Sequence, residues 1–331
     1  MVAHGDILMK IKIFLNSAGS MWQHDLLTKF AEGVERRKSE EDVVEFSLDD
    51  TVSACDVAVI FGSWKDRDKG HHIIRSNVAT RSRCFVVIET ALLGRKVKEE
   101  NTYWRVGVNG FLNHQGKFLS RDMPGSRYTQ LNLPGWQGWK NNPQGHIVML
   151  LQLPGDASLR RTNIWEWALY TISEIRKYSE KPIVIRPHPL MNLKPGDEFF
   201  EFYYKLNNLG LKNISVSDPA VEPLKQQLNN AYCTVSFTSG SSIDSIIEGI
   251  PVIAMDPGNF AWDVSSRYPE QITDIPRVPN QRIEQWLWNL AWSQWNKNEM
   301  KSGQCWEHLL PICKSVLDIT EEDSGEKKKK K

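Results

Sequence analysis

This sequence has few of the features that mark secreted, membrane or nucleic-acid-binding proteins. Its 331 residues include five cysteines, an odd number without paired or metal-like spacing, which favours a reducing compartment. No apolar run reaches the about 18 residues that a membrane span requires, and no signal peptide is evident. The formal net charge of +1 gives no general attraction to polyanions. We therefore expect a soluble cytoplasmic protein without membrane insertion.

Two common cofactor and metal motifs are also missing. The turn at residues 16–20 lacks the Gly-x-Gly-x-x-Gly pattern of a dinucleotide site, so NAD is not expected. The triplet at residues 66–68 is Asp-Arg-Asp, but it lies in a charged, helix-like stretch and not at the end of a strand. The sequence therefore predicts no cofactor and no essential divalent metal.

Short apolar runs alternate with helical spacing along most of the chain. In the first half, strand patterns cover residues 10–15, 43–48, 57–61 and 84–88, with a helix pattern at 22–37. A second series begins with a strand at 146–153 and a helix at 163–178 and continues with strands at 182–186 and 214–217. Such alternation is typical of parallel, right-handedly wound sheets. The length favours two α/β domains.

Two stretches depart from this alternation. Residues 101–142 are irregular and rich in Gly, Asn, Trp and Pro, which in a compact domain indicates a functional or poorly ordered segment. Trp136 on this stretch is suited to stacking on a sugar or base, or to packing at a domain junction. Residues 282–300 place tryptophans at helical spacing, which favours a packed helix.

Residues 235–256 carry the strongest functional signal. They predict a buried strand, a turn of small hydroxylated residues that opens a helix, a glycine that ends it, and a second buried strand. The N–H groups of a helix start favour an anion, hydroxyls of the serines add donors, and Gly240 tolerates unusual backbone angles. The pattern predicts a phosphate pocket. An ordinary serine-capped helix is the alternative.

A second signal lies at residues 182–189, where a Val/Ile strand ends in Arg186, Pro187, His188 and Pro189. Ligands of open α/β sheets collect outside the carboxyl ends of strands. There an imidazole can donate to a diphosphate or sugar, and a guanidinium can clamp phosphate. Arg160 follows another predicted strand and suits diphosphate; a solvated basic turn is the alternative.

Together these two segments resemble the C-terminal half of GT-B glycosyltransferases, including sialyl- and Kdo-transferase-like groups with His-Pro and Ser-Ser motifs and phage DNA-modifying glycosyltransferases. The resemblance covers residues 145–260. It implies an α/β fold with two Rossmann-like domains facing a cleft and C-terminal helices packing back on the first domain. It also implies that Asp244, five positions before Gly249, contacts the ribose or sugar, although Glu is more usual there; Glu248 is a neighbouring alternative.

The resulting expectations are specific. The domains are residues 1–142 for the acceptor side, 143–280 for the nucleotide-sugar, 281–319 for a Trp-rich helical return and 320–331 for a disordered Lys-rich tail. The donor-binding set is Arg160, Arg186, His188, Thr238, Ser239, Gly240, Ser241, Ser242 and Asp244. The catalytic candidates are Glu89 and Asp66, which could serve as base, and His188, while Trp64 and Trp136 are expected to bind the acceptor.

The predicted function is transfer of a sugar from a nucleotide-sugar to a hydroxyl. One acceptor is hydroxymethylated pyrimidine in phage double-stranded DNA, in the host cytoplasm; the alternative is a polysaccharide or lipopolysaccharide, with a CMP- or UDP-sugar as donor. The basic residues that favour DNA are Arg75, Arg81, Arg83, Arg95, Lys96 and Lys98. A sugar-nucleotide epimerase of the same architecture and a non-catalytic nucleotide-sugar or DNA-binding protein stay open.

Overall fold

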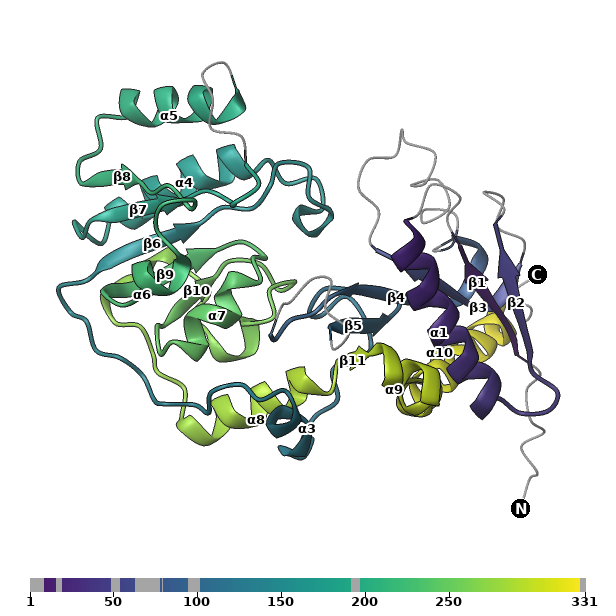
Figure 1. Cartoon of the computed structure of the whole chain (residues 1–331). Coiled ribbons are helices and arrows are strands. Elements are labelled where there is room, and N and C mark those ends of the chain that lie inside the picture. Colours follow the sequence, from purple (N-terminus) through teal and green to yellow (C-terminus); the bar gives the residue numbers. More distant parts are fainter. Residues whose placement is uncertain are drawn as a thin grey trace. The chain divides into compact units, whose positions relative to one another are not determined.

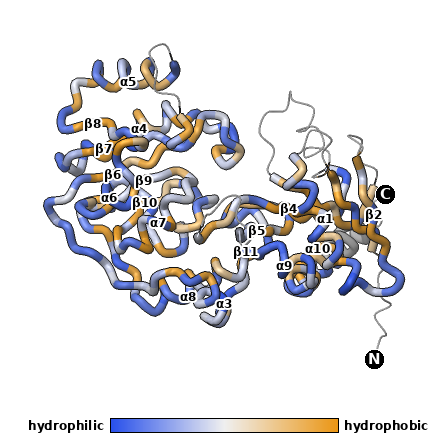
Figure 2. Tube along the Cα trace, viewed as in Figure 1, coloured by the Kyte–Doolittle hydropathy of each residue, from blue (hydrophilic) through white to orange (hydrophobic). Residues whose placement is uncertain are grey.

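The computed structural model describes residues 9–15, 20–48, 54–62, 78, 80–94, 102–191 and 197–327, without the side chains of 319–327. The chain forms two compact units (Figure 1). Unit 1 comprises Met1–Phe111, Gln115–Leu131 and Trp288–Lys331, and unit 2 comprises Leu112–His114 and Asn132–Leu287. Each unit is an α/β structure around its own sheet, as the sequence predicts, and stretches of hydrophobic colour run along strands of both sheets in Figure 2.

Unit 1 has a six-stranded sheet of order β2-β1-β3-β4-β5-β11. Its strands are β1 (Lys10–Phe14), β2 (Val43–Ser47), β3 (Cys55–Phe61), β4 (Ser82–Thr90), β5 (Tyr103–Val108) and β11 (Gln294–Asn296). The first four are parallel, as expected, whereas β5 is antiparallel to β4 and to β11. The irregular segment predicted from residue 101 therefore begins with a strand. Gly107 fits this strand because a Cβ there would meet the Gly110 carbonyl oxygen at 2.2 Å.

The C-terminal helices pack on unit 1, which confirms this part of the predicted architecture. The helices of the unit are α1 (Met21–Arg37), α3 (Ser126–Gln130), α9 (Lys297–Ser302) and α10 (Gln304–Lys327). Phe30 of α1 meets Trp306 of α10 edge to face inside the core. At Gly33 of α1, a Cβ would lie 1.8 Å from the Met300 carbonyl oxygen, so glycine permits the close approach of α9. Of the predicted tail 320–331, residues through Lys327 continue α10, and the last four lie outside the described residues.

The expected single helix across residues 282–300 is wrong. α8 (Asn280–Ala291) ends before the strand β11, and α9 follows directly. Trp295 lies in β11 opposite Trp104, buried in the core of unit 1. Pairing with β5 therefore overrides the helical spacing of the tryptophans, as tertiary contacts commonly override local preference.

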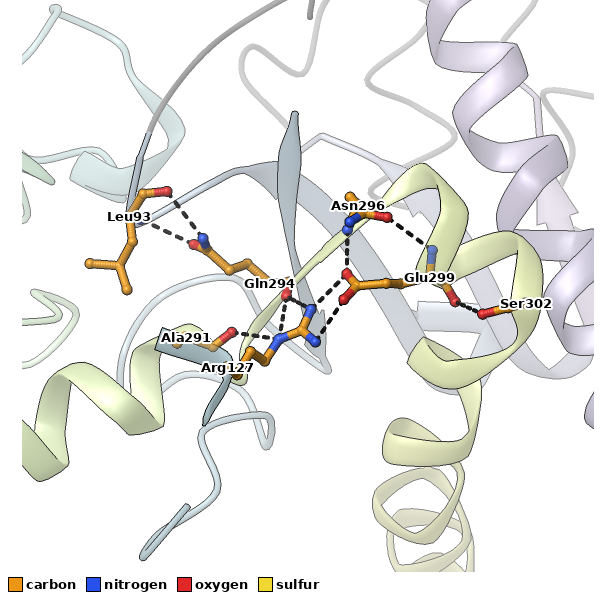
Figure 3. A network of polar contacts seen from close by, with 7 residues as sticks. All are labelled: Leu93, Arg127, Ala291, Gln294, Asn296, Glu299 and Ser302. Carbon is orange, nitrogen blue, oxygen red and sulfur yellow. Dashed lines mark hydrogen bonds and ion pairs between the residues drawn. The ribbon is translucent and has the colours of Figure 1, made fainter. Parts of the chain in front are cut away.

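A buried polar network joins the segments that complete unit 1 (Figure 3). Arg127 of α3 forms two bonds with the carboxylate of Glu299, at 2.9 and 2.7 Å, and donates to the carbonyl oxygens of Ala291 and Gln294. The side-chain oxygen of Gln294 accepts hydrogen bonds from the backbone N–H groups of Leu92 and Leu93, both at 3.0 Å. The turn after β4 is thus fixed to the returning C-terminal segment.

His308 of α10 packs against Trp292 and Trp295, with ring centroids 5.7 and 5.3 Å away, and its Nε2 lies 3.5 Å from the Ser120 hydroxyl. Burial, with the charge of Arg127, lowers the pKa of His308. At pH values between the lowered pKa of His308 in the folded protein and its ordinary pKa in the unfolded chain, the unfolded state therefore binds more protons than the folded state. His308 stabilises the fold fully above that ordinary value, and this contribution is lost as pH falls toward the folded pKa.

Replacing His308 by Phe should therefore make the stability of the protein less dependent on pH between about 7.5 and 5. Urea unfolding at both pH values measures this. His114→Phe is the control because His114 is half exposed, in unit 2, beside Asp263. If the free energy of unfolding depends equally on pH in wild type and in His308→Phe, the lowered pKa of His308 is not a source of the pH dependence.

Unit 2 has a five-stranded parallel sheet of order β10-β9-β6-β7-β8. Its strands are β6 (His146–Leu150), β7 (Ile183–Arg186), β8 (Ile214–Val216), β9 (Ala231–Ser236) and β10 (Val252–Ala254), and its helices include α4 (Ile164–Arg176), α5 (Glu198–Asn208), α6 (Leu224–Leu228) and α7 (Ser241–Ile247). The chain runs from β6 outward to β8 and then crosses to β9 on the other side. The carboxyl ends of β6 and β9 therefore form a topological switch point, where open α/β sheets bind ligands.

Two findings concern membrane spans and the state of the cysteines. In the described part of the chain, no helix combines the length and the apolar character needed to cross a bilayer. All five cysteines are buried and form no disulfide. Burial raises the pKa of Cys55 to about 11 and the pKa of Cys233 further, so these thiols are packing groups and not reactive thiolates.

Candidate functional site at the switch point of unit 2

Gln152 joins the two loops that diverge at the switch point. It follows β6 and is buried, and its side-chain oxygen accepts a hydrogen bond from the backbone N–H of Thr238, beyond β9, at 2.9 Å. Its Nε2 donates to the hydroxyls of Thr238 and Ser158 at 3.0 and 2.5 Å. Gln152 was not among the predicted site residues, although it is the first polar residue after the apolar run of β6. It fixes the floor of the candidate site.

Arg160 and Arg161 adopt an uncommon backbone conformation beside this floor. Their φ angles are 49° and 75°, in the left-handed region that L-residues other than Asn and Asp seldom occupy. The preceding 3₁₀ turn, Ala157–Leu159, is capped by Asp156, whose carboxylate accepts from the Ser158 N–H at 2.9 Å. Strained residues of this kind cluster at functional sites. The strain therefore marks the arginine turn as a candidate for ligand binding.

The Arg160 side chain extends to the end of β10, where its guanidinium forms an ion pair with Asp256. The Arg160 side chain stays 41% exposed, whereas that of Asp256 is 12% exposed. Asp256 also accepts from the Gly258 N–H at 2.7 Å, so the carboxylate is held in place. Arg160 is thus a partly exposed cation with a fixed position at the carboxyl edge of the sheet.

The predicted phosphate turn lies on the same edge, at the start of α7. Ser239, Gly240 and Ser241 are each partly exposed, and the Ser239 hydroxyl accepts from the Ser241 N–H at 3.2 Å. Gly240 has φ −63° and ψ −20°, so the expectation of an unusual backbone angle there is wrong. The glycine still leaves the turn without a side chain at this position.

Two hydroxyls of the predicted donor set face the interior. Ser242 is fully buried, and its hydroxyl lies 2.6 Å from that of Ser236; Asn259 Nδ2 donates to both, at 3.1 and 3.0 Å. Thr238 is also buried, and its hydroxyl donates to the Ser158 carbonyl oxygen at 3.0 Å. The prediction that Ser242 and Thr238 contact a ligand directly is therefore wrong. Both hydroxyls stabilise the turn from inside the protein. Asn259, which the sequence analysis missed, completes this network.

Arg186 and His188 follow β7 and have different environments. Arg186 is buried, and its guanidinium donates to the carbonyl oxygen of Glu222 at 2.8 Å and to Gln227 at 3.3 Å. Burial also lowers its pKa. The expected phosphate clamp at Arg186 is thus replaced by a brace to the start of α6. His188 is partly exposed, and its Nδ1 accepts from the Leu190 N–H at 3.1 Å, which leaves the proton of the neutral ring on Nε2 as a donor.

The two acidic candidates of α7 also differ. Asp244 is partly exposed in the first turn of the helix. Glu248 pairs with Lys225 at 3.1 Å and with Lys140 at 3.7 Å, so its carboxylate is engaged in ion pairs at the end of the helix. Asp244 lies in the same helix turn as the small hydroxylated residues, whereas Glu248 caps the other end of the helix, so Asp244 stays the candidate for a sugar or ribose contact.

The remaining predicted residues are distributed over other parts of the chain. Asp66 and Trp64 lie outside the described residues. Glu89, at the end of β4, belongs to unit 1, is partly exposed and accepts from the Thr90 N–H at 3.2 Å. Trp136 belongs to unit 2 and packs at 78° against Trp139, with centroids 5.0 Å apart. In the part of the chain that the structure describes, no three His, Cys, Asp or Glu side chains form a metal-binding cluster.

No family model matches the sequence, and no curated protein does. The chain has two Rossmann-like sheets, and its C-terminal segment belongs to the unit of the first sheet. These two features define the architecture. The fold is of the GT-B type. A solved structure titled as a beta Kdo 2,7 transferase, KpsC of Thermosulfurimonas dismutans, is similar to this chain at 12% identity and a TM-score of 0.49, covering 89% of this chain and 98% of its own.

Two further solved structures are similar at 12% identity. The beta Kdo 2,4 transferase of the same Thermosulfurimonas dismutans protein gives a TM-score of 0.44 and covers 86% of this chain and 90% of its own. A Methanocaldococcus jannaschii UDP-GlcNAc 2-epimerase in complex with UDP-GlcNAc and UDP gives 0.33, with 92% and 100% covered. At these identities and TM-scores the likeness assigns no activity to this chain.

Proposed function

We propose that this chain is a glycosyltransferase that binds a nucleotide-sugar at the switch point of unit 2 and transfers the sugar to a hydroxyl group. One observation carries the proposal. Arg160, on a strained backbone, is held by Asp256 beside the small hydroxylated turn at Ser239–Ser241, at the edge where parallel sheets bind ligands. A cation and hydroxyl donors that converge on one edge suit a diphosphate.

The chemistry of glycosyl transfer assigns a role to each of these groups. The leaving diphosphate gains negative charge as the bond to the sugar breaks, and prearranged donors stabilise that charge most effectively. The Arg160 guanidinium can bind phosphate oxygens in pairs, and Ser239, Ser241 and the Nε2–H of His188 add donors. Asp244 accepts from a ribose or sugar hydroxyl. No metal is needed in this scheme, because the positive charge comes from the protein.

A base must take the proton of the acceptor hydroxyl if the reaction inverts the anomeric centre. Glu89 and Asp66, both from the acceptor-side half of the chain, are the proposed candidates. An epimerase would instead act without an acceptor, so product analysis on nucleotide-sugar alone separates the two activities. A non-catalytic binding protein would form no product in either assay.

The acceptor that we favour is a carbohydrate, with duplex DNA as the alternative. The DNA interpretation depends on basic residues at 75–98, most of which lie outside the described part. Arg83 lies within the described part. It pairs with Asp56 at 3.3 Å and donates to the Leu317 carbonyl oxygen at 3.1 Å, so its side chain stabilises the packing of unit 1. Duplex binding that weakens steeply with salt would favour DNA.

The donor site is tested by thermal stabilisation with UDP-, GDP-, CMP- and ADP-sugars and the free nucleotides. A ligand at a hundred times its Kd should add about 2.7 kcal/mol to stability. We expect one nucleotide class to stabilise the wild type and Arg160→Gln to lose most of this shift, because the cation that meets the phosphates is removed. Arg277→Gln is the matched control, since Arg277 is an exposed arginine near Tyr232 at the amino end of β9, opposite the site.

Each variant is compared with its own ligand-free stability, because Arg160→Gln also leaves Asp256 without its cation. An equal ligand shift in Arg160→Gln and wild type would remove Arg160 from the donor site. No shift in wild type with any nucleotide would overturn the proposed function.

A further inference from the structure

Three aromatic rings form a stack in unit 1 that none of the roles above uses. Trp22 lies on Trp104, with ring centroids 5.2 Å apart and planes at 17°. Phe61 meets both rings edge-on, with centroids at 5.1 and 5.6 Å. Trp104 is 5% exposed, whereas Trp22 is 40% exposed. Trp22 is therefore the outer ring of a stack whose lower members are held in the core.

The stack lies on the ligand-binding edge of its sheet. In unit 1 the chain passes from β1 to β2 on one side and then to β3 on the other, so β1 and β3 diverge at their carboxyl ends. Trp22 is in the first turn of α1, which follows β1; Phe61 is the last residue of β3, and Trp104 pairs with Thr90, the last residue of β4. The same rule that places a ligand at the switch point of unit 2 therefore places one here, at the carboxyl edge of the unit 1 sheet.

Within the described residues, the segments that adjoin the stack carry no lysine or arginine. These segments are residues 20–24, 59–62, 90–94 and 102–104. A site for nucleic acid depends on cations that neutralise the phosphate backbone, so these segments suit an uncharged ligand.

The same segments offer neutral hydrogen-bonding groups. Ser20 and Thr90 are exposed, and Thr90 lies on the face of the sheet that carries its cross-strand partner Trp104. The Gln23 side-chain oxygen accepts from the Ser20 N–H at 3.1 Å, which fixes the start of α1 under Trp22. A flat apolar ring flanked by hydroxyls matches a sugar, which has one face of C–H groups and a rim of hydroxyls.

We propose that Trp22, supported by Trp104 and Phe61, is a stacking surface for a sugar ring of the acceptor. This inference rests on the proposed glycosyltransferase function and gives the acceptor a chemical class, a neutral carbohydrate. An indole held by two other rings loses little conformational entropy when a ligand binds, because its position is already fixed.

The test measures binding of the full chain to labelled neutral oligosaccharides built from glucose, galactose, mannose and N-acetylglucosamine, with a 20-base-pair duplex as the competing class. We expect at least one oligosaccharide to bind, Trp22→Ala to weaken it at least tenfold, and Trp22→Phe to retain part of the affinity. Tyr170→Ala is the control, because it removes an exposed aromatic ring from α4 in unit 2. Nucleotide stabilisation should be the same in Trp22→Ala and wild type.

The outcomes separate the two proposals. Unchanged oligosaccharide affinity in Trp22→Ala, binding of the duplex alone, or no binding to any member of the set would each overturn the stacking surface. Failure of the nucleotide experiment, with oligosaccharide binding that depends on Trp22, would instead overturn the transferase and leave a carbohydrate-binding unit.

Discussion

Arg127→Met should lower the free energy of unfolding by about 3–5 kcal/mol, the usual cost of removing one partner from a buried ion pair. The Arg127 side chain is 5% exposed, and that of its partner Glu299 is 14% exposed. The guanidinium also lies 3.9 Å from the ring centroid of Trp295. Without the arginine, the Glu299 carboxylate and the carbonyl oxygens of Ala291 and Gln294 lose a donor inside the protein (Figure 3).

Urea unfolding followed by circular dichroism measures this change, and two comparisons make it specific. The double variant Arg127→Met/Glu299→Leu should be more stable than Arg127→Met, because no charge is left buried without a partner. Lys29→Met breaks the ion pair between Lys29 and Glu32, which are both partly exposed, and should change the stability little, because water screens exposed pairs. A loss below about 1 kcal/mol in Arg127→Met, on the same scale, would show that the network contributes little.

The same variant should disturb the turn that follows Glu89. Gln294, whose carbonyl oxygen accepts from Arg127, holds Leu92 and Leu93 through its side chain. If Glu89 is the base, an Arg127 variant should lose activity even at temperatures where it remains folded. A positioning effect of this kind appears in the rate and not in nucleotide binding.

His188→Ala should lower the rate of sugar transfer by about 10²–10³-fold, the range found when one donor to a developing negative charge is removed. The imidazole is partly exposed at the end of β7, and its orientation is fixed by the hydrogen bond from the Leu190 N–H to Nδ1. The stability of the protein should change little, because Leu190 is an exposed residue and water can replace the imidazole. The measurement is release of free nucleotide from the donor in the presence of acceptor.

His188→Gln is the matched variant, since its amide nitrogen reaches about as far from the backbone as Nε2 of the imidazole and keeps a hydrogen-bond donor there. It should recover part of the activity if hydrogen bonding is the role of His188. Full activity in His188→Ala would exclude His188 from the chemistry. A large loss of stability in that variant would show that the imidazole serves the fold.

The sequence predicted most of the parallel strands because their apolar runs are continuous and end in turn residues. It did not predict β5, whose run is interrupted by Arg105 and Gly107, or β11, whose Trp295 continued the helical spacing of α8. Both strands depend on pairing with distant segments, which periodicity within a window does not register. Antiparallel additions at a sheet edge are therefore the elements that sequence patterns miss most easily here.

The candidate site shows the same limit at the level of single residues. Ser239 and Ser242 look alike in sequence, yet one is partly exposed and the other is sealed beneath the turn by Asn259. Arg160 was placed at the correct edge, but its partner Asp256 is 96 residues away and became evident only from the structure. Which polar groups face a ligand depends on packing, and packing is a property of the whole unit.

The route of the chain also determines when each unit can be completed during synthesis. Nearly all of unit 2 is one continuous stretch, Asn132–Leu287, which leaves the ribosome before the last part of unit 1 is made. The core of unit 1 needs Trp295, Met300 and Trp306, and its sheet needs β11. Since domains generally fold as units during translation, the half that begins the chain is the last to finish folding. Part of the apolar surface of its first strands therefore stays uncovered until the final helices are made.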